Sequence, residues 1–292
     1  MHYSVIAILH NPKSTGDSKA NAKKLKADLE AKGLTNVILQ ATTHAGHAEE
    51  LAYDLSMRSS QPLIISSSGD GGYNEVINGA LRAQAQGAHP TTCVIPSGNA
   101  NDHFNQLHHG DTAERIIKGH RQHIDVLHVT ADSADYHFSR YAHSYIGFGV
   151  TPEIGKELNA AELNATNEIA ISIKSLLKSK PFAISEQGKK QEYQSIVFSN
   201  VAKMAKVLGL AKDSAVDDGL FEVFALPPSK AFLLVLIVKS ATVGIRYTKQ
   251  TDHYDFRTIQ KQAVQCDGEI FDIKGKAKVR VGIEQKVLAC IV

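Results

Sequence analysis

The chain has 292 residues, enough for about two domains, and 43% of them are hydrophobic while 21% are charged. This balance is typical of an ordinary globular protein and excludes a disordered or fibrous chain. The formal net charge of +2 gives no sign of a nucleic-acid partner, and we expect none.

Two further features bear on where the protein works. The longest apolar run, Ala231–Val238, is far shorter than the about twenty residues that a membrane-spanning helix needs, so we expect no transmembrane segment. Cys93, Cys266 and Cys290 lack C-x-x-C spacing and are odd in number, which indicates buried free thiols. With no secretory signal in the sequence, we expect a cytoplasmic protein that could associate peripherally with the inner face of the membrane.

The first part of the chain alternates short apolar runs with segments of helical period. Strands are expected at 3–9, 36–42, 62–68 and 91–98, and helices at 17–33, 47–58, 74–87 and 112–120. Strands that alternate with helices predict an α/β domain with a doubly wound parallel sheet.

From about residue 125 the pattern changes to strands. They are expected within 123–130, 134–149, 191–202, 219–226, 258–273, 276–283 and 286–292, with helices near Pro152–Lys178 and Ser229–Ser240. We therefore predict a nucleotide-binding α/β domain at 1–127 and a β-sandwich at 128–292, whose last strand could return to the first domain.

The expected strands of the first domain end in polar, glycine-rich loops: HNPKSTG, ATTHAGHA, SSSGDGGYNE and IPSGNANDH. The carboxyl ends of parallel strands are where such sheets bind ligands, and glycine lets backbone N–H groups approach a phosphate. Asp70 and Asp102 are the carboxylates that a hydrated Mg²⁺ would use beside a polyphosphate. Turn chemistry alone is the alternative for each loop. Neither G-x-x-x-x-G-K-[ST] nor a strand-following G-x-G-x-x-G is present, which excludes Walker-type and dinucleotide sites.

Five segments, in order, carry a family resemblance. NPKSTG is similar to N-P-x-S-G, SGDGGYNEVING to G-G-D-G-T-x-N-E-V-x-N-G, PSGNANDH to P-x-G-T-x-N-D, VDDGLFEV to D-G-x-L-x-V and VQCDGE to V-x-x-D-G-E. The chain resembles the bacterial diacylglycerol and lipid kinases, which share a superfamily with sphingosine kinases, NAD kinases and phosphofructokinases. The resemblance implies an ATP-dependent kinase in which the nucleotide lies between an α/β domain and a lipid-holding β-sandwich.

The resemblance also implies roles for individual residues. The nucleotide site would comprise Asn11, Thr42, Gly69, Asp70, Gly71, Gly72, Tyr73, Asn74, Glu75, Asn99 and Asp102. Asp218, with the backbone oxygens of Ala215 and Leu220, would hold a structural Mg²⁺. Asp267 would be the general base, supported by Glu269. Asp-Gly is also the commonest hairpin signal, so a turn is the alternative for Asp267 and Asp218.

The sequence departs from the family pattern at the phosphate loops. Gly72 and Asn99 stand where the family has threonine, and Ser68 stands for the first glycine of G-G-D-G-T. The expected function is transfer of the γ-phosphate of ATP to the hydroxyl of a diacylglycerol-like lipid presented at a membrane surface. A catalytically weakened nucleotide- or lipid-binding member and an NAD kinase-like enzyme stay open. If the site is merely weakened, Gly72→Thr should tighten ATP binding.

Fourteen histidines raise the question of a metal site. The densest group is His103–His109, where no acidic set completes the usual zinc spacing. We expect surface histidines there.

Overall fold

The computed structural model describes residues 3–12, 14, 16–107, 110–159, 171, 174–175, 178–204, 208–209, 215–229, 232 and 249–292. The chain divides into two compact units, Met1–Val126 with Gln285–Val292 (unit 1) and Leu127–Glu284 (unit 2). It passes from one unit to the other twice, in strands β5 (Arg121–Ser133) and β18 (Lys278–Ile291).

Unit 1 is built on a parallel sheet. Its strands are β1 (Val5–His10), β2 (Val37–Ala41), β3 (Pro62–Ser68) and β4 (Thr91–Pro96), in the order β2-β1-β3-β4. The end of β18 adds a further parallel strand beside β4, with Cys290 opposite Thr92. Every residue of β3 is buried, as expected for a strand that is covered on both faces.

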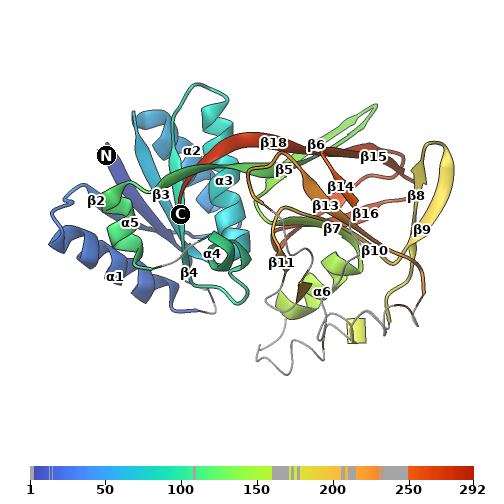
Figure 1. Cartoon of the computed structure of the whole chain (residues 1–292), viewed down its shortest axis with the longest axis horizontal. Coiled ribbons are helices and arrows are strands. Elements are labelled where there is room, and N and C mark those ends of the chain that lie inside the picture. The colour runs from blue at the N-terminus through green and yellow to red at the C-terminus, as the bar shows by residue number, and fades with distance from the viewer. Residues whose placement is uncertain are drawn as a thin grey trace. The chain divides into compact units, whose positions relative to one another are not determined.

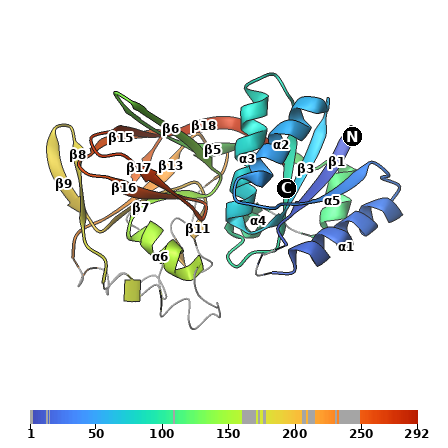
Figure 2. The ribbon, with the colours of Figure 1, turned by 180° about the vertical axis from the view of Figure 1, so that it is seen from behind.

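Five helices surround this sheet: α1 (Ser18–Ala31), α2 (His47–Arg58), α3 (Asp70–Gln84), α4 (Asp102–Leu107) and α5 (Thr112–Lys118). Figures 1 and 2 show α2 and α3 side by side on one face of the sheet, with α1 and α5 on the other. Alternate strand residues such as Ile6 and Ile8 pack in one core with Leu25 and Leu29 of α1. The predicted doubly wound α/β fold is confirmed.

Unit 2 consists of two antiparallel sheets. The first has the order β14 (Lys249–Thr251), β13 (Phe221–Leu226), β10 (Ser195–Ser199), β7 (Tyr145–Gly149), β16 (Gln262–Cys266) and β17 (Glu269–Ile273). In the second, β6 (Tyr136–Ala142), β5, β18, β15 (His253–Thr258), β8 (Phe182–Glu186) and β9 (Lys189–Tyr193) follow one another. A short pair, β11 (Lys203–Met204) with β12 (Leu208–Gly209), and helix α6 (Val150–Asn159) complete the described elements.

One core joins the two sheets of unit 2. Phe148, Phe198 and Phe221 of the first sheet pack with Phe256 of the second, and the Phe148 and Phe256 ring centroids are 5.3 Å apart in an edge-to-face arrangement. Edge-to-face rings are a preferred geometry of aromatic pairs. The predicted β-rich sandwich is confirmed.

Some expectations fall on parts of the chain that the structure does not describe. The helix expected at Pro152–Lys178 is present in its first part as α6, and most of its remainder lies outside the described residues. The expected helix at Ser229–Ser240 and the apolar run Ala231–Val238 lie almost wholly outside them. No helix in the described part of the chain has the length and apolar character to cross a membrane.

The three cysteines are free and buried, as the sequence predicted. Burial raises the pKa of all three thiols, that of Cys93 to about 12. None of them is therefore a ready nucleophile at neutral pH.

The last glycine of the SGDGGYNEVING segment is required by the contact between α2 and α3. A Cβ atom built on Gly79 would lie 2.2 Å from the carbonyl oxygen of Glu49 and 3.0 Å from the Cβ of Ala52. Both contacts are with α2, and the first is with its rigid backbone. Only glycine lets the two helices approach this closely.

Gly79→Ala should therefore destabilise the protein even though alanine is the better helix former. We expect a loss of about 1–3 kcal/mol in the free energy of unfolding, the usual cost of overpacking. Urea denaturation followed by circular dichroism measures it. The matched control is Gln84→Ala on the exposed side of α3, where a change within about 0.5 kcal/mol is expected. Equal stability of Gly79→Ala and the wild type would contradict the contact.

Candidate active site

A network of serines joins the loops that follow β1, β3 and β4. Ser18, at the start of α1, and Ser67, in β3, each donate a side-chain hydrogen bond to the other's carbonyl oxygen. The Ser67 hydroxyl also lies 3.1 Å from that of Ser97, which accepts from Asn21 at 2.9 Å. The Ser18 hydroxyl in turn accepts from the backbone N–H of Asn11 at 3.1 Å. These hydroxyls hold the loops together, so little of their bonding capacity is left for a ligand.

A hollow of about 330 Å³ lies beside this network. It is lined by Asn11, Pro12, Ser14, Asp17, Ser18, Lys19, Ala20 and Lys23, from the β1–α1 loop and the start of α1. Lys19 and Lys23 are one helical turn apart and both are exposed. Burial, and then the positive charges of the two lysines, lower the pKa of nearby His10. The hollow thus combines two lysines and one carboxylate, that of Asp17, with a helix N-terminus, and the excess of positive charge favours an anionic ligand.

Asp70 links the β3–α3 and β4–α4 loops. It is the first residue of α3, and its carboxylate accepts the backbone N–H groups of Asp102 at 3.1 Å and of His103 at 3.2 Å. The same side chain therefore satisfies two backbone donors at the start of α4. We call this contact the Asp70 clamp.

Close contacts between the backbones of the two loops support the clamp. The N–H of Ser97 donates to the carbonyl oxygen of Ser68 at 3.0 Å. A Cβ atom on Gly98 would lie 2.2 Å from the Cα of Gly69, and one on Gly69 would lie 3.0 Å from the Cα of Gly98. Glycine is required at both positions because the two loops touch backbone to backbone.

Ser68 and Gly72 form a complementary pair. A Cβ atom on Gly72 would lie 2.5 Å from the hydroxyl oxygen of Ser68 and 2.7 Å from its Cβ. The Ser68 side chain, which is bonded to the Ser66 hydroxyl at 2.7 Å, thus fills the space that a side chain at position 72 would need. The residues at 68 and 72, both of which depart from the family pattern given above, are therefore in direct contact, and the size of one limits the size of the other.

Glu75 holds the loop that contains Thr42. Its two carboxylate oxygens accept the backbone N–H groups of Gly46 at 2.8 Å and Ala48 at 3.1 Å, at the N-terminus of α2. Thr42 itself donates its backbone N–H to the His10 carbonyl oxygen at 2.9 Å. Glu75 is thus a positioning residue for this loop in the structure.

The remaining residues of the predicted nucleotide site differ in exposure. Tyr73 and Asn74 are fully buried, and the Tyr73 hydroxyl lies 2.9 Å from that of Thr92 in the core. Gly71 and Gly72, at the start of α3, and Asn99, on the β4–α4 loop, are half-buried. The structure brings the eleven predicted residues to the loops and helix starts of unit 1, but it directs several side chains inward.

The histidine-rich segment His103–His109 was expected at the surface. For His103 this is wrong, because the side chain is 1% exposed and its ring packs against Tyr73 with centroids 4.9 Å apart. His108 and His109 lie outside the described residues. The segment opens α4, and the inward face of that short helix could not be recognised from composition.

In unit 2, Asp267 is fully buried at the turn between β16 and β17. Its carboxylate accepts the backbone N–H groups of His143 at 2.7 Å, Ser144 at 2.9 Å and Tyr145 at 2.9 Å. Asp267 and Gly268 have φ values of 49° and 101°, which is the hairpin geometry expected of Asp-Gly. Asp267 therefore does form the hairpin turn that was the alternative to a catalytic role. Its carboxylate also holds the segment before β7 in place.

Glu269 is half-buried as the first residue of β17, opposite Cys266. The three predicted metal ligands lie on one exposed loop before β13. There the Asp218 carboxylate accepts the backbone N–H of Leu220 at 3.0 Å, and Ala215 and Leu220 are exposed. An exposed carboxylate is the kind of oxygen ligand that Mg²⁺ takes in proteins.

Comparisons with known proteins agree with this architecture. Residues 5–129 match the diacylglycerol kinase catalytic domain. Over 253 residues the chain is 26% identical to a diacylglycerol kinase of Bacillus subtilis strain 168, covering 78% of each chain. Over 237 residues it is 26% identical to a diacylglycerol kinase of Staphylococcus saprophyticus, covering 75% of this chain and 70% of the other.

The fold is shared with solved structures. A crystal structure of a diacylglycerol kinase from Bacillus anthracis strain Sterne superposes with a TM-score of 0.73 at 18% identity, covering 100% of this chain and 97% of the other. The resemblance of this chain to the bacterial diacylglycerol and lipid kinases is therefore confirmed, and the comparisons support a kinase.

The Ser68–Gly72 pair reverses the expectation for Gly72→Thr. The new side chain would collide with Ser68, so we expect the single variant to lose stability and to bind ATP more weakly than the wild type. In Ser68→Gly/Gly72→Thr the space is vacated, and stability and ATP affinity should largely return. Thermal unfolding and equilibrium ATP titration of both variants and of Ser68→Gly complete the cycle. Strictly additive effects of the two substitutions would show that the pair is not coupled.

Proposed function

We propose that this protein is an ATP- and Mg²⁺-dependent lipid kinase that transfers the γ-phosphate of ATP to a hydroxyl of a diacylglycerol-like lipid. The observation that carries the proposal is the match of residues 5–129 to the diacylglycerol kinase catalytic domain. The loops within that range are the ones that the serine network and the Asp70 clamp hold together. The lysine-lined hollow supports an anionic ligand there.

In this proposal the backbone N–H groups of the loops and the side chains of Lys19 and Lys23 bind the nucleotide phosphates. Asp70 and Glu75 act on those loops rather than on the phosphates, because their carboxylates already accept backbone N–H groups. Gly71 would let a phosphate oxygen approach the backbone, whereas Gly69 is required by its contact with Gly98 and the space beside Gly72 is filled by Ser68. Asp218 and the carbonyl oxygens of Ala215 and Leu220 would hold a Mg²⁺ that stabilises the loop before β13.

Asp267 is the proposed general base. A new bond forms between the lipid hydroxyl oxygen and the γ-phosphorus as the bond from that phosphorus to the β–γ bridging oxygen breaks, and the hydroxyl proton passes to a carboxylate. The Asp267 carboxylate would have to release part of its backbone bonding and become accessible to act in this way. Its burial favours the second candidate, a weakened member that binds nucleotide or lipid without efficient transfer.

The partner in this proposal is a lipid in a bilayer, and the working location is the cytoplasm at the inner face of the membrane. The substrate hydroxyl would lie in the headgroup region of the bilayer, where a protein at the membrane surface can reach it.

A labelled-phosphate assay tests the proposed function. The purified protein is incubated with [γ-³²P]ATP, Mg²⁺, NAD and vesicles made from a total lipid extract, and the labelled product is identified. A labelled lipid, absent without Mg²⁺, is the expected result. Label on NAD but on no lipid would indicate the NAD kinase-like alternative, and ATP binding without any transfer would indicate the non-catalytic one.

Lys19→Ala and Lys23→Ala test the phosphate role of the hollow. Each should weaken ATP binding by several-fold, because each removes one positive charge beside the phosphates. Lys24→Ala is the matched control, since Lys24 is an exposed lysine of α1 that does not line the hollow. Equilibrium titration with ATP measures all three. If Lys24→Ala weakened binding as much as the other two, the effect would be one of net charge and the hollow would have no special role.

Asp267→Asn tests the general base. Turnover should fall by about 10²–10⁴-fold while ATP affinity stays within about twofold, because only the proton acceptor is lost. Thermal unfolding must accompany the assay, since the amide would place its N–H₂ group among three backbone donors. Asp272→Asn, at an exposed carboxylate of β17, is the control. A folded Asp267→Asn protein with normal turnover would overturn the assignment.

A further inference from the structure

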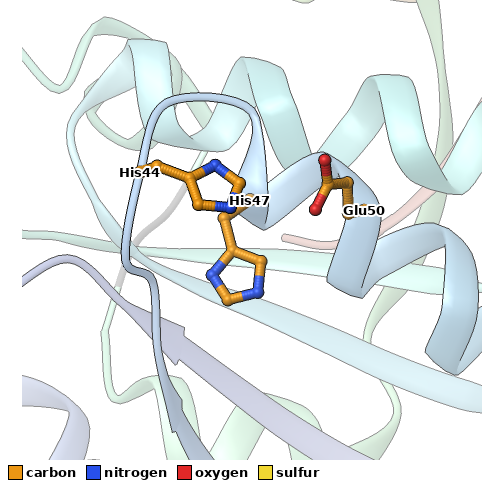
Figure 3. A group of neighbouring side chains, drawn as sticks. All are labelled: His44, His47 and Glu50. Carbon is orange, nitrogen blue, oxygen red and sulfur yellow. The ribbon is translucent and has the colours of Figure 1, made fainter.

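Two histidines and a glutamate meet at the start of α2, outside the groups that the proposed function uses. His44 lies on the preceding loop, and His47 and Glu50 lie in the first turns of the helix, as Figure 3 shows. One ligand atom from each side chain lies within 4.8 Å of the others. His44 and Glu50 are exposed and His47 is half-buried, so a metal ion could reach the cluster from solvent.

From this cluster we infer a binding site for a transition-metal ion of the zinc type. Two imidazoles and a carboxylate are a donor set that suits Zn²⁺ and its neighbours, whereas Mg²⁺ prefers oxygen ligands alone. Donors around a tetrahedral Zn²⁺ are roughly 3.3 Å apart, given bonds of about 2.0–2.1 Å. The ligand atoms of the cluster lie within 4.8 Å of one another, and rotation of the exposed His44 and Glu50 side chains can bring them to this shorter distance. A water molecule would complete the coordination.

The two histidines are prepared for metal binding to different degrees. The Nδ1 atom of His44 lies 3.0 Å from the carbonyl oxygen of Ala45, which can only accept, so Nδ1 carries the proton and Nε2 keeps its lone pair. A ring N–H that donates to a backbone carbonyl is the usual support of a metal-binding imidazole. His44 is therefore already in the tautomer that a metal needs.

His47 must change before it can bind. Its Nδ1 atom lies 3.1 Å from both the backbone nitrogen and the hydroxyl oxygen of Thr43. The backbone N–H can only donate, so Nδ1 accepts it and the neutral ring carries its proton on Nε2. Neither nitrogen then offers a free lone pair. A metal ion must displace the Thr43 N–H from Nδ1, or the ring proton must move to Nδ1 and be donated to the Thr43 hydroxyl, which leaves Nε2 for the metal. In either case the bond from the Thr43 N–H to His47 is lost. The site is thereby coupled to the loop that contains Thr42.

The test is a titration of the full-length, chelator-treated protein with Zn²⁺ alone, in competition with a chromophoric chelator. Loss of an outer-shell partner costs about 10–100-fold in metal affinity, and so loss of a ligand in His44→Asn, His47→Asn or Glu50→Gln should cost at least about tenfold. Asn at position 47 keeps an acceptor for the Thr43 N–H. His89→Asn, at an exposed histidine elsewhere in unit 1, is the matched control and should bind as the wild type does.

The backbone amide of Thr43 gives a second measurement that does not depend on the variants. Its ¹⁵N–¹H signal should shift on addition of one equivalent of Zn²⁺ and stay unchanged with the same amount of Mg²⁺. Equal zinc affinity in all four variants and the wild type, or an unshifted Thr43 signal at saturation, would overturn the proposal. Neither outcome bears on lipid phosphorylation, which is assayed separately.

Discussion

The Asp70 clamp is the contact on which the loop edge of unit 1 depends. One carboxylate at the start of α3 accepts two backbone N–H groups at the start of α4, more than thirty residues further along the chain. Both helix N-termini favour a negative charge at this point, so the clamp is stabilised electrostatically as well as by its hydrogen bonds. The close approach of Gly69 and Gly98 and the bond from the Ser97 N–H to the Ser68 carbonyl oxygen join the same two loops and support the clamp.

As a consequence, most of the polar side chains in the expected phosphate loops form hydrogen bonds within the protein. Glu75 holds the N-terminus of α2, the serines join three loops, and Tyr73 bonds to Thr92 in the core. The groups left to meet an anion are backbone N–H groups, the half-buried glycines, and the lysines of α1. In this account the threonine missing at position 72 matters little to phosphate binding, because the loop is shaped by backbone contacts and the space beside Gly72 is filled by Ser68.

The sequence was sufficient to predict the strands and four helices of unit 1 and the strand-rich character of unit 2, because the pattern of apolar residues along a strand or helix reflects which of its faces are buried. It did not predict α4, whose six residues are too few to show a clear period. The motif residues could be placed at the ends of the strands because the apolar runs that predict the strands stop there. The partners of Asp70, Glu75 and Asp267 could not be predicted, since each accepts from residues at least 27 positions away, and up to 124 for Asp267. The polar composition of the segment suggested that His103 is exposed. Its burial depends instead on which face of the short helix α4 it occupies. The His44–His47–Glu50 cluster could not be recognised from the sequence because one of its side chains comes from a loop and two from α2, and only the fold brings them together.

Hydrogen exchange of the backbone amides with and without Mg²⁺ and ATP tests the central claim most directly, namely that the loops joined by the Asp70 clamp form the phosphate-binding edge. Saturating nucleotide should slow exchange in residues 69–72 and 99–101 and at the start of α1, because backbone N–H groups there would donate to phosphate oxygens. The N–H groups of Ser97, Asp102 and His103 already donate within the protein and should change less. Protection confined to other parts of the chain, with these loops unchanged, would contradict the account.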